Sequence, residues 1–433
     1  MRTLILLFSA FLNQVLTQKL VVVVVDGLPG NAYYKFAHLP AFRTFEEEGV
    51  WSTKLFPSFP SFSLTNRVSL LTGVPPKRHG IIADHMFNWR TKEAFHNMTE
   101  PTDYDISWWS VEPLYVSATK AKAAVAMFYF PECLIDWKPH PHLCIGPRHD
   151  GKSFADDSEV KAVIQATKTH DLILVYHPLI EAELSHLGIK HATEKNAKEI
   201  LRFQQSLDRL TSQARERIDL NVIVVSTHGM VDVPRKHIRV LDEYISMDLI
   251  NMTIGSGAVK QVIAKTGKTH QVYSQLRHHN PIPNVKIYYT THKTSDMPEW
   301  YQYKKSETVT DLVMIADPAY AIVTKDKTKQ FPEPHLHEVP HAISGYNNQY
   351  PDIQGIFLAY GPAFRVGYKK GPLEVFDVYT LICSLMSIEC NPTPGRIQRV
   401  DDVLTSDARV SVRNASVCLS LVIIFVISLL VAL

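Results

Sequence analysis

Five runs of consecutive apolar residues constrain the fold of this 433-residue chain more than any other feature. Each run has the length of a strand and is rich in β-branched or aromatic residues; they occupy 20–25, 123–130, 172–176, 222–225 and 356–359. Since apolar and polar residues do not alternate, both faces of each strand are expected to be buried, as in a parallel sheet covered by helices. Helical patterns such as 194–218 lie between the runs. The sequence therefore predicts an α/β fold with a mainly parallel central sheet flanked by helices on both faces.

The body of the chain is predicted to be one domain, spanning 19–405. Roughly 254–320 is more irregular, with short β-prone pieces and several prolines, and is expected to form a small insertion or cap on the main sheet. No repeat, low-complexity segment or linker divides the chain. Because the formal net charge is only +2, a nucleic-acid polymer is not an expected partner.

Both ends of the chain have the pattern of processing signals. Residues 1–18 contain an early arginine and an apolar run, which is typical of a secretory signal peptide. Residues 417–433 are uncharged and apolar, 406–416 form a polar spacer, and Ser406, Asp407 and Ala408 are small residues before it. This order predicts a glycosylphosphatidylinositol anchor on the extracellular side of the cell surface. A single C-terminal transmembrane span is the alternative.

A secreted chain is expected to oxidise its cysteines. Four of the five precede the apolar tail, and we predict the two local pairings, Cys133 with Cys144 and Cys383 with Cys390. Three sequons for N-glycosylation occur, at Asn97, Asn251 and Asn414.

A candidate nucleophile stands where an apolar helical pattern begins. Ser63 opens this pattern, and backbone N–H groups left unpaired at a helix start attract anions. We therefore predict that Ser63 attacks a phosphoryl group and that Asn66, one turn later, donates a hydrogen bond to its oxygen. The alternative is that Ser63 only caps the helix.

Further polar residues follow the predicted strands. Asp26, the segment 177–186 and Thr227–His228 come directly after apolar runs, and 345–348 precedes the last run. Ligands of open α/β sheets bind at the carboxyl ends of the strands. These residues are thus expected to outline one site with Ser63.

Taken together, these segments resemble the ecto-nucleotide pyrophosphatase/phosphodiesterase family of the alkaline phosphatase superfamily. The resemblance covers roughly 20–396 and rests on several motifs in order: VVVVVDG, S-x-T-N-x-x-S-x-x-T-G with HGII, VIVVSTHGM, PEWYQY, GYNN and IFLAYGPAF. It implies an alkaline phosphatase-like fold, two zinc ions, and a threonine or serine nucleophile activated by one metal while the other polarises the phosphoryl oxygen.

Carried onto this chain, the resemblance gives an incomplete set of zinc ligands. Asp26, Ser63 and His228 match the ligands of one ion, and Glu181 and His186 are what remains for the other. The departures are Thr227 in place of an aspartate, Ser344 in place of a histidine, and a spacing of five instead of four between Glu181 and His186. His341, Asp232 and Glu183 are the substitutes that lie near in sequence.

The sequence thus leads to two hypotheses of function. The first is a cell-surface protein of this kind whose degraded two-zinc site leaves it catalytically impaired or inactive, acting in binding of phosphodiester small molecules or lipids. The alternative is an active metal-dependent phosphodiesterase that uses Ser63 on nucleotide or choline and lipid phosphodiesters. A glycoprotein that makes no use of the cleft is a third interpretation.

Overall fold

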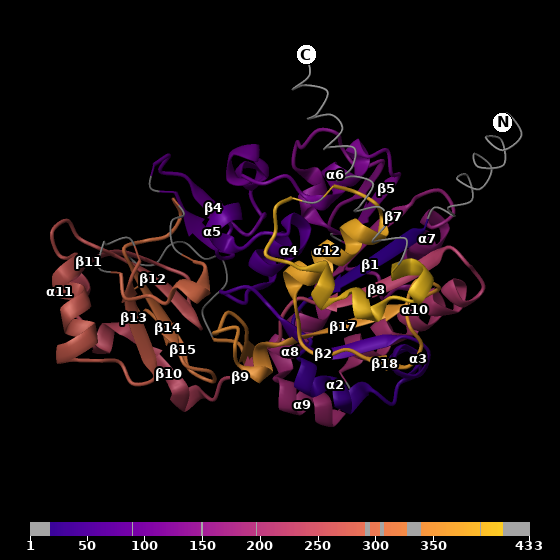
Figure 1. The fold of residues 1–433 in the computed structure, drawn as a ribbon. Helices are drawn as coiled ribbons and strands as arrows, with labels where there is room; N and C mark the ends of the chain where they lie inside the picture. Colours follow the sequence, from indigo (N-terminus) through magenta and orange to yellow (C-terminus); the bar gives the residue numbers. More distant parts are fainter. Residues whose placement is uncertain are drawn as a thin grey trace, which may run out of the picture.

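The predicted central sheet is present in the computed structural model. The structure describes residues 18–409 except 89, 149, 196, 291–294, 304–306, 327–338 and 390. Its main sheet has nine strands, in the order β18 (Tyr368–Lys369), β2 (Val50–Phe56), β17 (Gly355–Tyr360), β8 (Leu220–Ser226), β1 (Lys19–Val25), β7 (Leu172–His177), β5 (Val125–Phe128) and β6 (Leu143–Ile145), with β19 (Leu373–Glu374) also beside β2 (Figure 1). All five apolar runs coincide with strands of this sheet.

The strand directions agree with a mainly parallel sheet. The five strands from β8 to β6 are parallel to their neighbours, whereas β17 runs antiparallel to both β8 and β2. Because β1, β7 and β8 are adjacent and parallel, the residues that follow them meet at one edge of the sheet.

Helices cover both faces of this sheet. One group packs around α10, with α3 and α7, and the other contains α4, α6 and α12 (Figure 1). The helices are α2 (Gly30–Phe36), α3 (Pro40–Glu48), α4 (Ser63–Thr72), α5 (Pro76–His79), α6 (Leu114–Lys120), α7 (Asp157–Ala166), α8 (Leu179–Leu187), α9 (Ile189–Lys195), α10 (Lys198–Arg215), α11 (Thr269–Ser274) and α12 (Val375–Leu385). In the described part of the chain, no helix combines the length and the apolar character needed to cross a membrane.

A smaller antiparallel sheet lies beside the main one. It contains β11 (Ile250–Ile254), β12 (Val259–Ala264), β14 (Leu312–Ala316) and β13 (Val285–Tyr289), in that order (Figure 1). Its side chains belong to a hydrophobic cluster separate from that of the main sheet. The four strands span 250–316, which overlaps the predicted insertion, 254–320, with a shift of four residues at each end.

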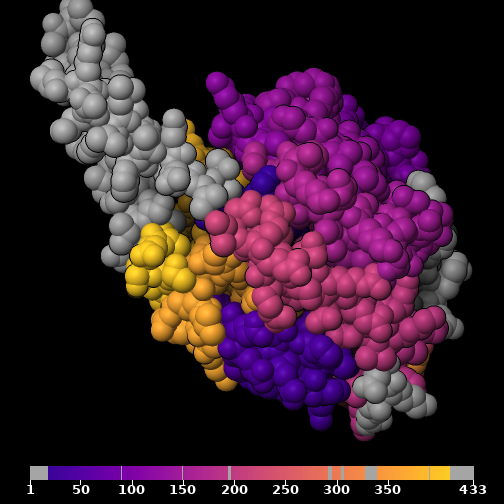
Figure 2. All heavy atoms as spheres, turned by 90° about the vertical axis from the view of Figure 1, so that its right-hand side faces the viewer, coloured from indigo at the N-terminus to yellow at the C-terminus, as the bar shows by residue number. Residues whose placement is uncertain are grey.

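Three short strand pairs complete the fold. They are β3 (His85–Phe87) with β4 (Ala94–His96), β9 (Val231–Asp232) with β16 (Ala342–Ile343), and β10 (Ile238–Val240) with β15 (Ala321–Val323). Figure 2 shows that segments from the beginning, middle and end of the described chain lie together on one face of the molecule (Figure 2).

One of the two predicted disulfides is confirmed, and the other is partly supported. Cys133 and Cys144 are bonded, with Cα atoms 5.8 Å apart. Cys383 is disulfide-bonded as well, but Cys390 lies outside the described residues, so this pairing stays a prediction. The sequon residues Asn97 and Asn251 are exposed. Asn414, the signal peptide up to residue 17 and the tail from 410 lie outside the described residues.

Candidate active site

Ser63 is the first residue of α4, and local sequence explains why the helix begins there. The preceding segment contains Pro57 and Pro60, and a residue before proline is disfavoured in helical conformation. The helix therefore starts only after the second proline, and it ends at Gly73, which adopts the left-handed conformation with φ +70°. Phe62 holds the capping position, so Ser63 is not the N-cap and its hydroxyl is available to the site.

The Ser63 hydroxyl is held between a carboxylate and an imidazole. It donates to Glu181 Oε2, and its oxygen lies 3.0 Å from His228 Nε2. His228 Nδ1 is 2.9 Å from the carbonyl oxygen of Gly229, which can only accept, so Nδ1 carries a proton. In the neutral tautomer with this proton, Nε2 can accept a hydrogen bond. The single hydroxyl proton of Ser63 then lies between two acceptors, Glu181 Oε2 and His228 Nε2. Ser63 is placed as a nucleophile beside two groups that can accept its proton.

Glu181 and Ser344 form the opposite side of the site. Glu181 lies in α8, after β7, and its Oε1 accepts a hydrogen bond from Ser344 Oγ at 3.3 Å. His228 Nε2 lies 3.9 Å from the same oxygen. Burial raises the pKa of Glu181 above its ordinary value, with Asp26 adding to the rise and His228 opposing it. The serine at position 344 therefore acts as a donor to the carboxylate.

Asp26, directly after β1, has both carboxylate oxygens occupied by protein donors. Thr227 Oγ1 donates to Oδ1 at 3.1 Å, and the Tyr176 hydroxyl donates to Oδ2 at 2.5 Å. The guanidinium of Arg67 lies 3.7 Å from Oδ2. All of these groups are buried, and Asp26 and Thr227 have no exposed surface at all. The carboxylate is neutralised by a side-chain cation of this chain.

The pair of zinc ions implied by the resemblance does not fit these residues. Asp26 accepts from two hydroxyls and is ion-paired with Arg67, and Glu181 accepts from two hydroxyls. Both replaced positions therefore present hydroxyls as donors instead of ligands. Among the residues that the structure describes, no three or more His, Cys, Asp or Glu side chains gather as a metal site would require.

His186 is not brought to the site. Its side chain is exposed in the last turn of α8. Five residues on a helix correspond to about 500° of rotation, so His186 and Glu181 face directions about 140° apart. The structure thus does not bring His186 beside Glu181, and the changed spacing is the physical reason.

The substitutes considered from the sequence serve other purposes. Asp232 accepts from the backbone N–H groups of Ile189 and Lys190 at the start of α9. Glu183 likewise accepts hydrogen bonds from the backbone N–H groups of Lys198 and Glu199 at the start of α10. The His341 side chain is exposed. These carboxylates stabilise helix N-termini, which attract negative charge.

Asn66 also differs from its predicted role as a donor to a phosphoryl oxygen. The side chain is fully buried, and its amide donates to the carbonyls of Pro60 at 3.1 Å and Phe62 at 3.0 Å. Its Oδ1 accepts from the Ser58 N–H at 2.6 Å. Asn66 therefore fixes the proline-containing segment that leads to Ser63.

Sequence reasoning missed three charged members of the site. Arg67 and Glu132 are joined by a 2.6 Å contact between Nε and Oε1. The third is Asp84, whose Oδ1 is buried with no hydrogen-bond partner in the described structure. Burial, with Glu181 and Asp26 adding to it, raises the pKa of Asp84 to about 7. One signal was present: Arg67 is a charge inside a helix that is buried from Leu64 to Thr72.

Comparison with known proteins gives the same family as the sequence resemblance. Residues 20–347 match the family model described as type I phosphodiesterase / nucleotide pyrophosphatase. Human ectonucleotide pyrophosphatase/phosphodiesterase family member 5 is 27% identical over 396 residues, which covers 90% of this chain and 78% of the relative. Human bis(5'-adenosyl)-triphosphatase ENPP4 is 24% identical over 409 residues, with 90% and 84% covered.

Solved structures of member 5 have the same fold. The human protein has a TM-score of 0.80 at 26% identity, covering 90% of this chain and all of the other. The murine protein has a TM-score of 0.80 at 24% identity with the same coverage. An inactive variant of the murine protein has been solved in complex with AMP. With three quarters of its length matched by one family model, this chain belongs to the type I phosphodiesterase/nucleotide pyrophosphatase family.

Proposed function

We propose that this chain is a cell-surface member of its family that binds phosphodiester or phosphomonoester molecules and hydrolyses them poorly or not at all. One observation carries the proposal: Thr227 and Ser344, at two positions where the family resemblance implies metal ligands, donate hydrogen bonds to Asp26 and Glu181. Neutral hydroxyls are weak zinc ligands compared with carboxylate and imidazole.

The consequence for catalysis follows from what the two metals do. One lowers the pKa of the nucleophile, and the other stabilises charge on the phosphoryl oxygen. Each tenfold loss of rate corresponds to about 1.4 kcal/mol of transition-state stabilisation. Weakening both metal positions at once thus removes several powers of ten in rate, while contacts with the rest of a ligand remain.

A nucleotide is the first ligand to examine. A relative, murine member 5, has been solved with AMP in a variant made inactive by a substitution, so AMP is a ligand with a precedent in this fold. Choline and lipid phosphodiesters are the further candidates. The relatives carry the prefix ecto in their names, which supports an extracellular site of action.

A second candidate function is an active phosphodiesterase with Ser63 as nucleophile. The contacts of the Ser63 hydroxyl with Glu181 and His228 favour it, because they provide proton acceptors at the attacking oxygen. Glu181 and His228 would then also have to hold the metal of a reduced, single-ion site.

Hydrolysis and binding measured on the same ectodomain separate the two functions. We expect calorimetry to detect AMP binding. With zinc added, a chromogenic nucleotide ester and a choline phosphodiester should both be hydrolysed at close to the uncatalysed rate. Ser63→Ala should leave AMP affinity within a factor of about ten, since one hydrogen bond contributes about 0.5–1.5 kcal/mol. Zinc-dependent turnover that Ser63→Ala abolishes would establish the enzyme instead.

A further inference from the structure

Arg67 is a buried charge at the centre of the site. Its side chain is 4% exposed and lies between two carboxylates, 2.6 Å from Glu132 and 3.7 Å from Asp26. Arginine stays protonated at every pH at which proteins fold, and both carboxylates face its guanidinium here. The guanidinium therefore remains a cation, and arginine is the residue best suited to buried ion pairs of this kind.

The surroundings of Arg67 hold it in this position. Its guanidinium carbon lies 4.3 Å from the centre of the Tyr176 ring, a cation–π contact, and the hydroxyl of the same tyrosine donates to Asp26. Arg67, Asp26 and Tyr176 thus form a closed arrangement in which every pair is in contact. Tyr176 cannot move without affecting both partners.

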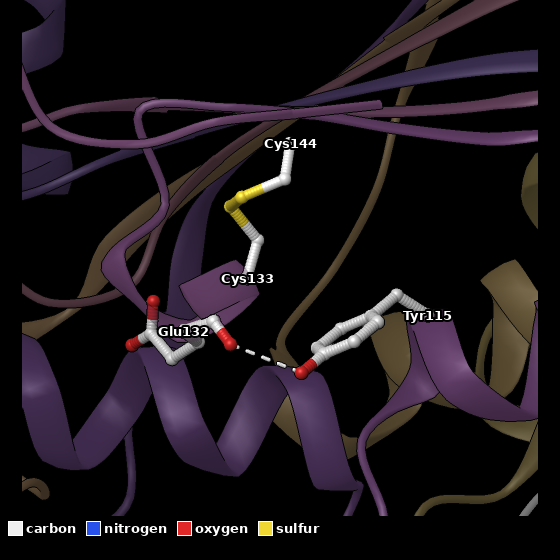
Figure 3. The surroundings of a disulfide bond; sticks show 4 residues. All are labelled: Tyr115, Glu132, Cys133 and Cys144. Carbon is white, nitrogen blue, oxygen red and sulfur yellow. Dashed lines mark hydrogen bonds between the residues drawn. A yellow bond between two sulfur atoms is a disulfide. The ribbon is translucent and has the colours of Figure 1, made fainter. Parts of the chain in front are cut away.

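The carboxylate of Glu132, the second that faces Arg67, lies in a turn held by a neighbouring disulfide bond. Glu132 lies in η3 (Pro131–Leu134), next to Cys133, which is bonded to Cys144 of β6 (Figure 3). Its backbone carbonyl accepts from the Tyr115 hydroxyl at 3.0 Å, while its carboxylate points away from the disulfide (Figure 3). The anion that faces Arg67 is therefore presented by an anchored turn.

We propose that Arg67 is the resident cation of this site: its guanidinium takes the electrostatic place of a metal ion at Asp26, and the folded chain needs no zinc there. The inference rests on the proposed function, whose impaired metal site it explains. A zinc ion on Asp26 would lie close to a fixed positive charge, and like charges repel strongly where little water screens them. The structure also gives that ion no anionic ligand in exchange, because a threonine occupies position 227.

Restoring a metal site at Asp26 would require more than one substitution. Thr227→Asp alone adds the missing carboxylate but leaves Arg67 beside it, so the new carboxylate would pair with the guanidinium. Only the removal of Arg67 frees both aspartates for a divalent cation. The two substitutions are therefore expected to act together in creating zinc affinity, which independent sites would not do.

The test uses the secreted ectodomain, elemental zinc analysis and thermal unfolding with zinc or a chelator. We expect less than 0.2 equivalents of zinc in the wild type, on the order of the background for a protein without a built site, and no change of Tm with chelator. The Thr227→Asp variant should have the same zinc content as the wild type and the same lack of response of Tm to chelator. Arg67→Leu with Thr227→Asp should gain about one equivalent of zinc and a Tm that rises several degrees on adding it.

A matched control replaces a different ion-paired arginine. Arg202 of α10 pairs with Asp156, which precedes α7, and with Glu199 of its own helix. Arg202→Leu with Thr227→Asp should gain no zinc. The inference is overturned if wild-type protein holds zinc and loses Tm with chelator, or if the folded Arg67→Leu/Thr227→Asp variant gains none. Should that variant not fold, the wild-type measurements decide alone. Turnover by zinc-free wild type would refute the proposed function and leave this inference standing.

Discussion

Asp84 is the residue whose charge state should make stability depend on pH. Burial raises its pKa to about 7, against about 3.9 in an unfolded chain. An acid with a higher pKa when folded binds its proton more tightly in the folded state. Its contribution to stability is therefore present below pH 4 and is lost as the pH rises to 7. We predict that Asp84→Asn, which cannot ionise, gains Tm relative to wild type as the pH is raised from 5 to 8.

The Tm difference between variant and wild type is the quantity to measure, because it cancels the pH dependence of every other group. Exposed Glu216 at the end of α10 provides a control, and the Glu216→Gln difference should be the same at both pH values. A Tm difference for Asp84→Asn that stays flat would show that Asp84 is ionised throughout this range, and one that falls with pH would equally contradict a raised pKa.

At the scale of residues, part of the candidate site could be predicted from the sequence. Asp26, Ser63, Thr227 and His228 could be predicted because each follows a strand or begins a helix, and a resemblance assigned them roles. Arg67 and Glu132 could not be paired, since 65 residues separate them and no local pattern links the two. The hydroxyl contacts of Asp26 and Glu181 could not be predicted either, because they join segments that are far apart in the sequence.

At the scale of elements, the end of α4 depends on one glycine. Gly73 has φ +70°, and an added Cβ would lie 2.3 Å from the ring of buried Tyr379 in α12. We predict that Gly73→Ala lowers the free energy of unfolding by about 1–2 kcal/mol for the left-handed backbone and by about 1–3 kcal/mol more for the overlap. Urea unfolding measures this loss.

Gly80 supplies the matched control for that prediction. It ends α5 with φ +83°, and an added Cβ would meet nothing within 4 Å. Gly80→Ala should therefore show the backbone cost of about 1–2 kcal/mol and no more. Equal losses for the two variants would mean that Tyr379 moves aside at no cost.

The elements that the sequence predicted are those buried on both faces. The five apolar runs became strands because their whole length is covered by helices. β2, in contrast, was not predicted: its burial varies along the strand and it contains an exposed lysine. Its pairing with β17, β18 and β19 is a long-range property of the sheet, which composition does not encode.

At the scale of the whole molecule, the last described residues lie where the sequence predicts lipid attachment. Thr405 is still held to the body, since its N–H donates to Ala363 at 2.9 Å and Phe364 pairs with Leu404. Ser406 and Asp407 come next and are exposed. Two of the three small residues of the predicted attachment site are thus accessible, while Ala408 is half-buried against the main core.

We predict that phosphatidylinositol-specific phospholipase C releases the protein from cells. The reason is the order of small residues, polar spacer and uncharged apolar tail. The measurement is immunoblotting of medium and membranes after treatment. Replacing Ala408 by tryptophan places a bulky side chain where a small one is needed, so this variant should not be released. Wild-type protein that stays in the membrane with residues 417–433 intact would instead identify the tail as a transmembrane span.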